Sequence, residues 1–307
     1  MTFDEAVGRL AAAGIDNPRA EARLLLAHAL GTSRDATLSA PPLTPDQAAH
    51  FEAMVARRAA REPLAYITGR KEFWSLDFAV GPGVLVPRPD TETLIEEAIR
   101  LYPDRSLPLA IADLGTGSGA ILIAALKEFP NARGIGFESS SQAFLWACRN
   151  AHALMPGRAE IRLADWTAAR GPFDLVFSNP PYIASAEIGT LEPDVRDHEP
   201  RAALDGGPDG LDAYRALGRL QPGMLEPGGH ALGEMVCERR EVGAGRGGGM
   251  PLDPLVADDQ PDQHRVDKNV MRAAFAGHHL GQRHAGRARN RGRRRGRGRR
   301  LGACSEH

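Results

Sequence analysis

The sequence predicts an α/β protein built on a doubly wound, mostly parallel sheet, with a small helical bundle before it. From residue 107 onward, short apolar strands alternate with helix-length segments, a pattern typical of a parallel sheet with helices on both faces. Before residue 70, apolar residues recur at helical spacing and no strand pattern interrupts them. After residue 237 neither spacing continues, so we expect an irregular C-terminal tail.

Residues 1–69 are expected to form the helical bundle. Gly14 ends a first helix, the Asn17–Pro18 pair begins a second, and Gly31 ends that second helix. The Thr44–Pro45 pair begins a third helix. Its inner face carries apolar residues at helical spacing and a polar residue that marks the edge of the stripe: Phe51, Met54, Val55 and Arg58.

The remaining elements follow in order. Residues 70–90 are expected to form a hairpin linker with its turn at Gly81–Gly83, and a helix begins at about Thr91. We assign residues 91–237 to one α/β domain, with helices after its first two strands. Its expected strands are Leu109–Asp113, Gly134–Glu138, Ile161–Asp165, Phe173–Ser178 and Gly229–Met235.

Composition limits the location and the class of the protein. With 307 residues, 42% of them hydrophobic, the chain can bury the core of one medium domain and a small companion. No run of 18 apolar residues occurs, the N-terminus lacks the apolar region of a signal peptide, and the three cysteines show no metal-ligand spacing. We therefore expect a cytoplasmic protein without a membrane segment or a metal. The sequence leaves the oligomeric state open, and a monomer is our expectation.

A glycine turn joins the first strand to its helix and is the first motif that carries chemistry. It comprises Gly115, Thr116, Gly117, Ser118 and Gly119. Glycine lets the backbone turn tightly and approach a ligand closely. Glycine turns also join strands to helices where no ligand binds, so this motif alone leaves both interpretations open.

Acidic and aromatic residues at the next strand ends favour a ligand. Glu138 ends the second strand, nineteen positions after Gly119, where doubly wound nucleotide-binding folds place a carboxylate that accepts hydrogen bonds from ribose hydroxyls. Asp165 and Trp166 end the third strand and would supply an acceptor for adenine and a flat apolar wall. The alternatives are a solvated glutamate at a strand end and an Asp-Trp pair that only caps and packs.

The sequence Asn179-Pro180-Pro181-Tyr182 directly follows the fourth strand. The prolines fix the backbone and lack N–H donors, Asn179 offers a side-chain carbonyl, and Tyr182 offers a ring face. A carboxamide nitrogen is a weak nucleophile because its lone pair is delocalised. Two acceptors that hold its hydrogens would orient it toward an electrophilic methyl group and stabilise the developing charge. We favour this interpretation over a simple Pro-Pro turn, because the upstream motifs occur in the expected order.

These motifs together resemble the class I, Rossmann-like methyltransferases that act on nitrogen atoms of planar groups. Further stretches resemble the bacterial release-factor glutamine methyltransferases in particular, over about residues 1–235. Those stretches are Glu62–Gly69, Glu72–Trp74, Val86–Glu92, His198–Arg201 and Asp205–Leu211. The family more often has Asp where Glu138 stands, and the longer side chain can make the same bonds.

The resemblance implies transfer of a methyl group from S-adenosylmethionine to the glutamine of the Gly-Gly-Gln loop in peptide-chain release factors, which would be the protein partners. It implies that Gly115–Gly119, Glu138, Trp166 and Asn179 contact the cofactor. It also implies that Asn179, Pro180, Pro181 and Tyr182 bind the glutamine, with Asn179, Pro180 and Tyr182 as the catalytic residues. The N-terminal helical domain would dock the release factor.

The segment Pro87–Glu92 would lie near the same pocket by resemblance. Its individual contacts are not implied. For Arg88 and Asp90, a role in the pocket and a role in turning or capping the chain are equally open.

Two other functions remain as alternatives. A nucleic-acid N-methyltransferase would act on an adenine amino group with the same NPPY site and would bind nucleic acid through the arginine-rich tail. Residues 1–235 show no basic cluster and no large target-recognition domain, which disfavours it. A non-catalytic RNA-binding protein would leave the glycine turn, Glu138 and the NPPY sequence without a purpose.

The tail departs from the family. Residues 238–307 contain no Ile, Thr, Tyr or Trp, residues 287–300 contain nine arginines, and the pattern of the family's C-terminal strands is missing. Three interpretations compete: a reading-frame shift near residues 232–240, a disordered segment that binds RNA or the ribosome, and an unfamiliar folded extension. We favour the frame shift, which predicts an exposed sheet edge and a destabilised enzyme.

Overall fold

The structure is a computed structural model that describes residues 1–39, 42–219, 224–236 and 268–273. All described residues lie in the first of the chain's two units, Met1–Phe275. The helices, strands and contacts given below all belong to the first unit. Most of the predicted tail, residues 238–307, lies outside the described residues.

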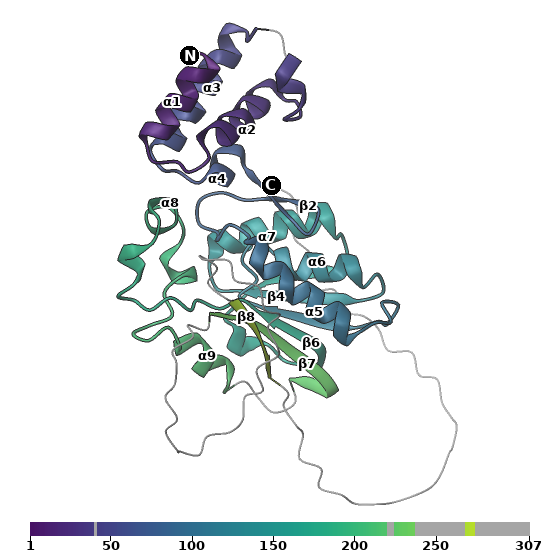
Figure 1. Cartoon of the computed structure of the whole chain (residues 1–307). Coiled ribbons are helices and arrows are strands. Elements are labelled where there is room, and N and C mark those ends of the chain that lie inside the picture. Colours follow the sequence, from purple (N-terminus) through teal and green to yellow (C-terminus); the bar gives the residue numbers. More distant parts are fainter. Residues whose placement is uncertain (40–41, 220–223, 237–267, 274–307) are drawn as a thin grey trace, which may run out of the picture. The chain divides into compact units, whose positions relative to one another are not determined.

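The N-terminal helices form where their capping residues predict (Figure 1). Thr2 and Thr44 each accept a hydrogen bond from the backbone three residues later, and Glu5 and Gln47 bond back to the capping residue, so both helices begin with a capping box. Gly31 ends the second helix in the left-handed conformation. The helices are α1 (Phe3–Ala12), α2 (Pro18–Leu30), α3 (Pro45–Ala59) and α4 (Leu64–Thr68), with a 3₁₀ turn at Ala36–Ser39.

The apolar faces of these helices pack against each other around Leu10, Leu25 and Phe51. Arg58 does not mark the edge of the stripe as expected, because it is only 5% exposed. Glu21 accepts a 2.5 Å hydrogen bond from its guanidinium, and Asp194 accepts another at 3.1 Å. Paired carboxylates allow a guanidinium to be buried, and a count of apolar positions cannot foresee that pairing.

A short antiparallel hairpin follows, made of β1 (Arg70–Phe73) and β2 (Leu76–Ala79). Its turn lies at Trp74 and Ser75, both with positive φ, and not at Gly81–Gly83 as predicted. The prediction was wrong because neither turn residue is glycine, so the sequence carried no signal for positive φ.

The predicted α/β sheet is confirmed. Its strand order is β5-β4-β3-β6-β7-β8, and every neighbouring pair is parallel except β7 with β8. The strands are β3 (Ala110–Leu114), β4 (Arg133–Glu138), β5 (Ala159–Leu163), β6 (Phe173–Ser178), β7 (Leu225–Val236) and β8 (Lys268–Ala273).

Both faces of the sheet are covered. One face packs Ile111, Leu175 and Phe177 against α5 (Thr93–Leu101), α6 (Ala120–Glu128) and α7 (Ser141–Leu154). The other face packs Ala112, Leu114 and Val176 against Trp166, Leu217 and Met224. The shorter elements are the 3₁₀ turns Pro89–Glu92, Trp166–Ala168, Ile188–Thr190 and Arg201–Ala203, with α8 (Pro193–Arg196) and α9 (Asp212–Leu217).

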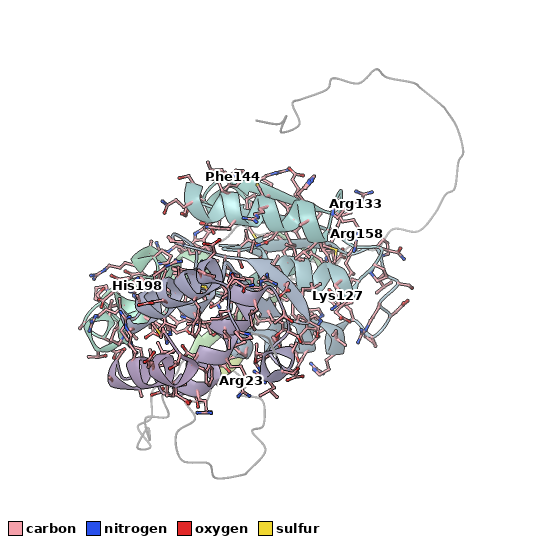
Figure 2. All side chains as sticks on the ribbon, turned by 90° about the horizontal axis from the view of Figure 1, so that it is seen from above. Arg23, Lys127, Arg133, Phe144, Arg158 and His198 are labelled. Carbon is pink, nitrogen blue, oxygen red and sulfur yellow. The ribbon has the colours of Figure 1, made fainter. Side chains whose placement is uncertain are left out.

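An arginine outside the site caps the end of α6. The guanidinium of Arg158 donates to the carbonyls of Leu126, Phe129 and Pro130, at 2.8, 3.2 and 3.1 Å. Arg158 and Arg133 are both labelled in the view from above (Figure 2). Carbonyls at the C-terminal end of a helix lack partners within the helix, so a cation there stabilises α6.

The structure differs from the prediction at the C-terminal edge of the sheet. We expected Gly229–Met235 to be the last strand, with an exposed edge, but Lys268–Ala273 pairs antiparallel with β7 from Ala231 to Val236. This short segment contains one β-branched residue, so its propensity for strand is weak. Pairing with an open strand edge, which the local sequence does not encode, selects its extended conformation.

Two smaller differences concern element ends. β5 covers Ala159–Leu163 and not Ile161–Asp165, because Asp165 instead caps the following 3₁₀ turn. The helix expected from about Thr91 begins with a 3₁₀ turn, and α5 proper starts at Thr93. Among the described residues, no helix has both the length and the apolar character needed to cross a bilayer.

Candidate functional site

The predicted site residues meet at the carboxyl ends of the parallel strands. Here the chain passes from β4 and β5, on one side of β3, to β6 on the other, and a doubly wound sheet opens a crevice at such a point. A cavity of about 240 Å³ occupies it. The structure places these predicted residues along its wall: Gly115, Thr116, Gly117, Ser118, Glu138, Asp165, Trp166, Asn179, Pro180 and Pro181.

Two predicted residues do not line the cavity. Gly119 lies at the start of α6 with a φ of 82°, where a Cβ would come within 3.1 Å of Ile123. Its role here is to let the chain turn into the helix. Tyr182 directs its hydroxyl to Glu234, to which it donates at 3.4 Å.

The glycine turn is bonded to β4 and borders the cavity. The amides of Gly115 and Thr116 donate to the carbonyl of Phe137, at 2.9 and 3.0 Å, which ties the turn to β4. Gly117 has a φ of 58°, and a Cβ built there would meet no heavy atom within 4 Å. The backbone at Gly117 is therefore accessible to a ligand.

Glu138 organises the same turn from the end of β4. Its Oε2 accepts from the amide of Gly117 at 2.9 Å, and its Oε1 accepts from the amide of Ser140 at 2.8 Å. The residue is 8% exposed and borders the cavity. Each carboxylate oxygen offers about two acceptor positions, so each keeps one for paired hydroxyls of a ligand.

A second carboxyl group, that of Asp113, bonds to the glycine turn. Asp113 is fully buried, and its Oδ2 accepts from the hydroxyl of Thr116 at 2.6 Å. No described group bonds to its Oδ1. Burial raises the pKa of Asp113 to about 7, partly offset by the bond from Thr116. Asp113 thus holds the turn in place without reaching the cavity.

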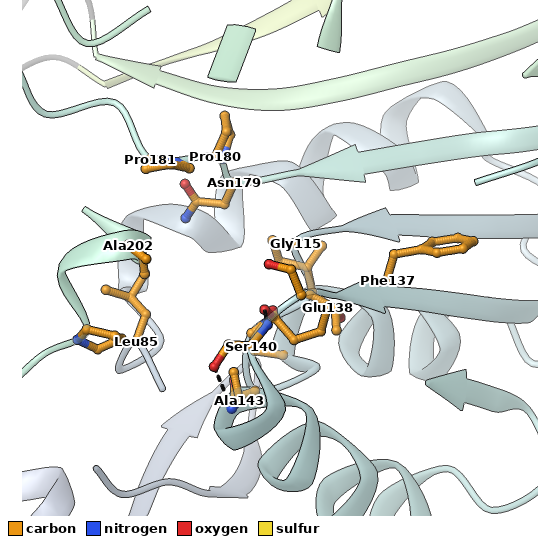
Figure 3. A pocket seen from close by; sticks show the side chains of 18 of the residues that line it. Leu85, Gly115, Phe137, Glu138, Ser140, Ala143, Asn179, Pro180, Pro181 and Ala202 are labelled. Carbon is orange, nitrogen blue, oxygen red and sulfur yellow. Dashed lines mark hydrogen bonds between the residues drawn. The ribbon is translucent and has the colours of Figure 1, made fainter. Parts of the chain in front are cut away.

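The neighbouring wall is flat and apolar. The ring of Trp166 lies 3.8 Å from the position a Cβ on Gly115 would take. Leu85 and Ala202 lie across the cavity from Glu138 (Figure 3). Asp165 accepts from the amide of Thr167 at 2.8 Å, so it caps the 3₁₀ turn while it borders the cavity.

Asn179 reaches into the cavity from the end of β6 (Figure 3). Its Nδ2 donates to the hydroxyl of Thr91 at 3.2 Å, which leaves Oδ1 as an acceptor for a ligand. Pro180 is buried beside it, and among the described residues nothing donates to its carbonyl. The side-chain oxygen of Asn179 and the carbonyl oxygen of the adjacent Pro180 are therefore both available as acceptors.

The segment after the NPPY turn (Asn179–Tyr182) comprises residues 183–211. It closes one side of the cavity through Pro200, Ala202 and Ala203. Its glycines pack on the turn: a Cβ on Gly206 would lie 2.8 Å from the Pro181 carbonyl, and one on Gly210 would lie 2.3 Å from the Tyr182 carbonyl. Only glycine allows this approach.

Arg88 lines the cavity and also pairs with a buried carboxylate. Glu199 accepts from Arg88 at 2.5 Å and from the amide of Val86 at 3.1 Å. Burial raises the pKa of Glu199, while Arg88 acts in the opposite direction. The two roles left open for Arg88 are therefore compatible. Asp90 does not line this cavity.

The sequence placed the segment Pro87–Glu92, which contains Thr91, near the pocket without assigning its contacts, and it gave no role to Glu234. Thr91 is 4% exposed and lines the cavity, and its hydroxyl donates to Glu234 of β7 at 2.6 Å. These two residues are 143 positions apart. The available signal was weak: Glu234 is a charged residue within an expected buried strand.

Comparisons with known proteins agree with these observations. The family model described as "PrmC N-terminal domain" matches residues 2–69, and the "Methyltransferase small domain" model matches residues 99–191. Three bacterial proteins similar to this chain are each named release factor glutamine methyltransferase. The Rhodospirillum rubrum protein is 48% identical over 231 residues, which cover 74% of this chain and 70% of the relative.

The other two relatives are similarly close. The Caulobacter vibrioides protein is 47% identical over 72% of this chain and 78% of its own length. The Cereibacter sphaeroides protein is 48% identical over 79% of this chain and 84% of its own length.

Proposed function

Because this chain belongs to the release factor glutamine methyltransferase family, we propose that it methylates the side-chain amide nitrogen of the glutamine in the Gly-Gly-Gln loop of peptide-chain release factors. The methyl donor in this proposal is S-adenosylmethionine. The observation that carries the proposal is the position of Asn179: it lines the cavity that the glycine turn and Glu138 also border, and its Nδ2 is bonded to Thr91, so its Oδ1 remains as an acceptor.

The residues of the cavity fit this cofactor. The open backbone at Gly117 can accommodate its methionine portion, and the remaining acceptor positions of Glu138 suit the two ribose hydroxyls. The ring of Trp166 offers a flat surface to the adenine. When bound, the cofactor supplies an electrophilic methyl group on a sulfonium sulfur.

Asn179 and Pro180 would act on the substrate amide. Their two carbonyl oxygens accept the two amide hydrogens, which fixes the plane of the amide and directs its nitrogen toward the methyl group. These acceptors also stabilise the positive charge that develops on the nitrogen. The nitrogen becomes more acidic as it forms its new bond, so it can lose a proton late without a strong general base.

We further propose that residues 1–69 dock the release factor and that residues 91–237 carry the chemistry. The match of a separate family model to residues 2–69 supports this division. In this proposal Tyr182 contributes to glutamine binding, and its bond to Glu234 fixes its ring.

The test is methyl transfer by the full chain with radiolabelled S-adenosylmethionine. A release factor, a nucleic acid and a release factor with its Gly-Gly-Gln glutamine replaced by alanine are offered in separate reactions. Label only in the intact release factor supports the proposal. Label in the nucleic acid would replace it with the adenine-directed alternative.

Removing the acceptor in Asn179→Ala should lower the turnover number about 10²- to 10³-fold, by analogy with the loss of one stabilising group at a reacting centre.

A further inference from the structure

A buried carboxylate of β7 connects two parts of the proposed glutamine site. Glu234 is 2% exposed and lies outside the lining of the cavity. Its Oε2 accepts from the hydroxyl of Thr91 at 2.6 Å, and its Oε1 accepts from the hydroxyl of Tyr182 at 3.4 Å. Thr91 in turn accepts from Nδ2 of Asn179 at 3.2 Å. Glu234 therefore contacts Tyr182 directly and Asn179 through Thr91, which are the two ends of the NPPY turn.

The direction of these bonds follows from the chemistry of Glu234. An ionised carboxylate can only accept, so the hydroxyl hydrogen of Thr91 must point toward it. The oxygen of Thr91 then has only acceptor capacity left for Asn179. Asn179 must present its NH₂ group to Thr91, and its Oδ1 is left for the cavity.

Without the carboxylate this preference disappears. A hydroxyl can donate or accept, so Thr91 could then donate to Oδ1 of Asn179 and reverse the amide. The reversed amide would present its NH₂ group to the cavity. A substrate amide nitrogen, whose two hydrogens need acceptors, would then face donors.

We infer that Glu234 is a positioning residue that fixes the amide orientation of Asn179 through Thr91. This inference rests on the proposed function. The orientation of the Asn179 amide matters for activity only if its Oδ1 accepts a hydrogen from the substrate amide. Glu234 also holds the hydroxyl of Tyr182 and so ties the far end of the turn to β7.

The test compares two substitutions of Thr91 in the full chain. Thr91→Val keeps the shape of the side chain and removes the hydroxyl, whereas Thr91→Ser keeps the hydroxyl and removes a methyl group. The turnover number for release factor, the KM for release factor and the dissociation constant for S-adenosylmethionine are measured for both. We expect Thr91→Val to lower the turnover number about 10- to 100-fold, Thr91→Ser to retain most of it, and cofactor binding to change little in either variant.

Equal losses in the two Thr91 variants would overturn the inference, because the methyl group and not the hydroxyl would then matter. A loss confined to cofactor binding would overturn it as well. Glu234→Gln provides a second variant. It introduces an NH₂ donor next to Thr91 or Tyr182, and it should lower the turnover number while the protein still melts cooperatively.

Failure of the inference can be distinguished from failure of the proposed function. Wild-type protein that labels no release factor contradicts the proposed function, whatever the variants do. The bond itself is tested without activity by thermal unfolding of Thr91→Val, Glu234→Gln and the double variant. If the two side chains are bonded, the double variant loses less stability than the sum of the single variants. Additive losses would show that Glu234 does not hold Thr91.

Discussion

At the scale of single residues, Glu138 has two roles, and both depend on its carboxylate as a hydrogen-bond acceptor. It accepts from the amides of Gly117 and Ser140, and in the proposed complex it also accepts from two ribose hydroxyls. Glu138→Gln places an NH₂ group where one of these donors must bond. Since hydrogen bonds to charged groups are worth about 1.5–3 kcal/mol each, we expect the dissociation constant for S-adenosylmethionine to rise about 10- to 100-fold.

Isothermal titration calorimetry of the cofactor measures this change. Glu160→Gln is the matched control, because Glu160 is an exposed carboxylate of β5 that pairs with Arg162. Unchanged affinity in Glu138→Gln would remove the carboxylate from the cofactor site.

The raised pKa of Asp113 predicts that the stability of the protein depends on pH. Burial raises its pKa in the folded protein to about 7, above the usual value of 3.8, so the folded protein retains a proton that the unfolded chain loses. The contribution of Asp113 to stability is therefore full below about pH 4 and is lost as the pH rises toward 7. The loss amounts to at most roughly 1.4 kcal/mol per pH unit in this window.

Asp113→Asn removes this titration while it keeps an acceptor for Thr116. The free energy of unfolding, measured with denaturant from pH 4 to 8, should favour the variant increasingly up to about pH 7 and then run parallel to the wild type. Parallel profiles over the whole range would show that Asp113 is ionised in the folded state.

Much of the site could be predicted from residues that form local motifs. The glycine turn, Glu138 and Asn179 stand at strand ends, and the shared edge of a parallel sheet brings such residues together. The bonds of Thr91 and Glu199 could not be predicted in this way. Each joins positions more than a hundred residues apart through a side chain whose partner no local pattern identifies.

At the scale of elements, the segment after the NPPY turn depends on close backbone contact. Gly210 has a φ of 75°, and a Cβ there would lie 2.3 Å from the Tyr182 carbonyl. Gly210→Ala must therefore shift the turn or the segment, and a displacement of about 1 Å near the chemistry can cost about 10²-fold in rate. We expect a loss of that order in the turnover number for release factor.

Gly189→Ala is the control in the same segment. A Cβ at Gly189 meets no heavy atom within 4 Å, and its φ is not positive. Steady-state kinetics of both variants at saturating cofactor provide the measurement. Similar activities in the two would show that the turn tolerates the displacement.

Element boundaries were predictable where a local signal ends the element. The helix Ser141–Leu154 follows the second strand as predicted, and the strand Phe173–Ser178 has its predicted bounds. Ser140 caps the former by accepting from the amide of Ala143, and the prolines after Asn179 end the latter. The strand Lys268–Ala273 could not be predicted, because its partner strand determines it.

At the scale of the whole molecule, one guanidinium joins parts of the chain that are far apart in sequence. Arg58 of α3 bonds to Glu21 of α2 and to Asp194 of α8. Burial acts to lower the pKa of Arg58, yet the two carboxylates leave it above the usual value. Arg58→Met keeps an unbranched side chain but leaves both carboxylates without this partner. We expect a loss of about 3 kcal/mol in the free energy of unfolding.

Arg57→Met is the matched control on the same helix. Arg57 pairs with Glu62 at the surface, with 46% of its side chain exposed, and such pairs contribute about 0–1 kcal/mol. Denaturant unfolding of both variants is the measurement. Equal losses would mean that burial of Arg58 adds nothing to its ion pairs.

The origin of the C-terminal part of the chain can be tested at the level of the gene. The pairing of Lys268–Ala273 with β7 covers an edge that we expected to be exposed. The hypothesis of a frame shift near residues 232–240 stays a prediction. The nucleotide sequence of these codons, translated in all frames, tests it: a second frame that encodes an apolar helix and strand would support it.

The bonds of the glycine turn also affect how fast a ligand can bind. The carbonyl of Phe137 and the carboxylate of Glu138 hold this turn through contacts within the protein itself. The entropy of ordering the loop is therefore lost during folding and not during association. A ligand that reaches this loop meets a preorganised surface, so its binding should proceed in a single concentration-dependent kinetic phase, without a slow rearrangement of the loop.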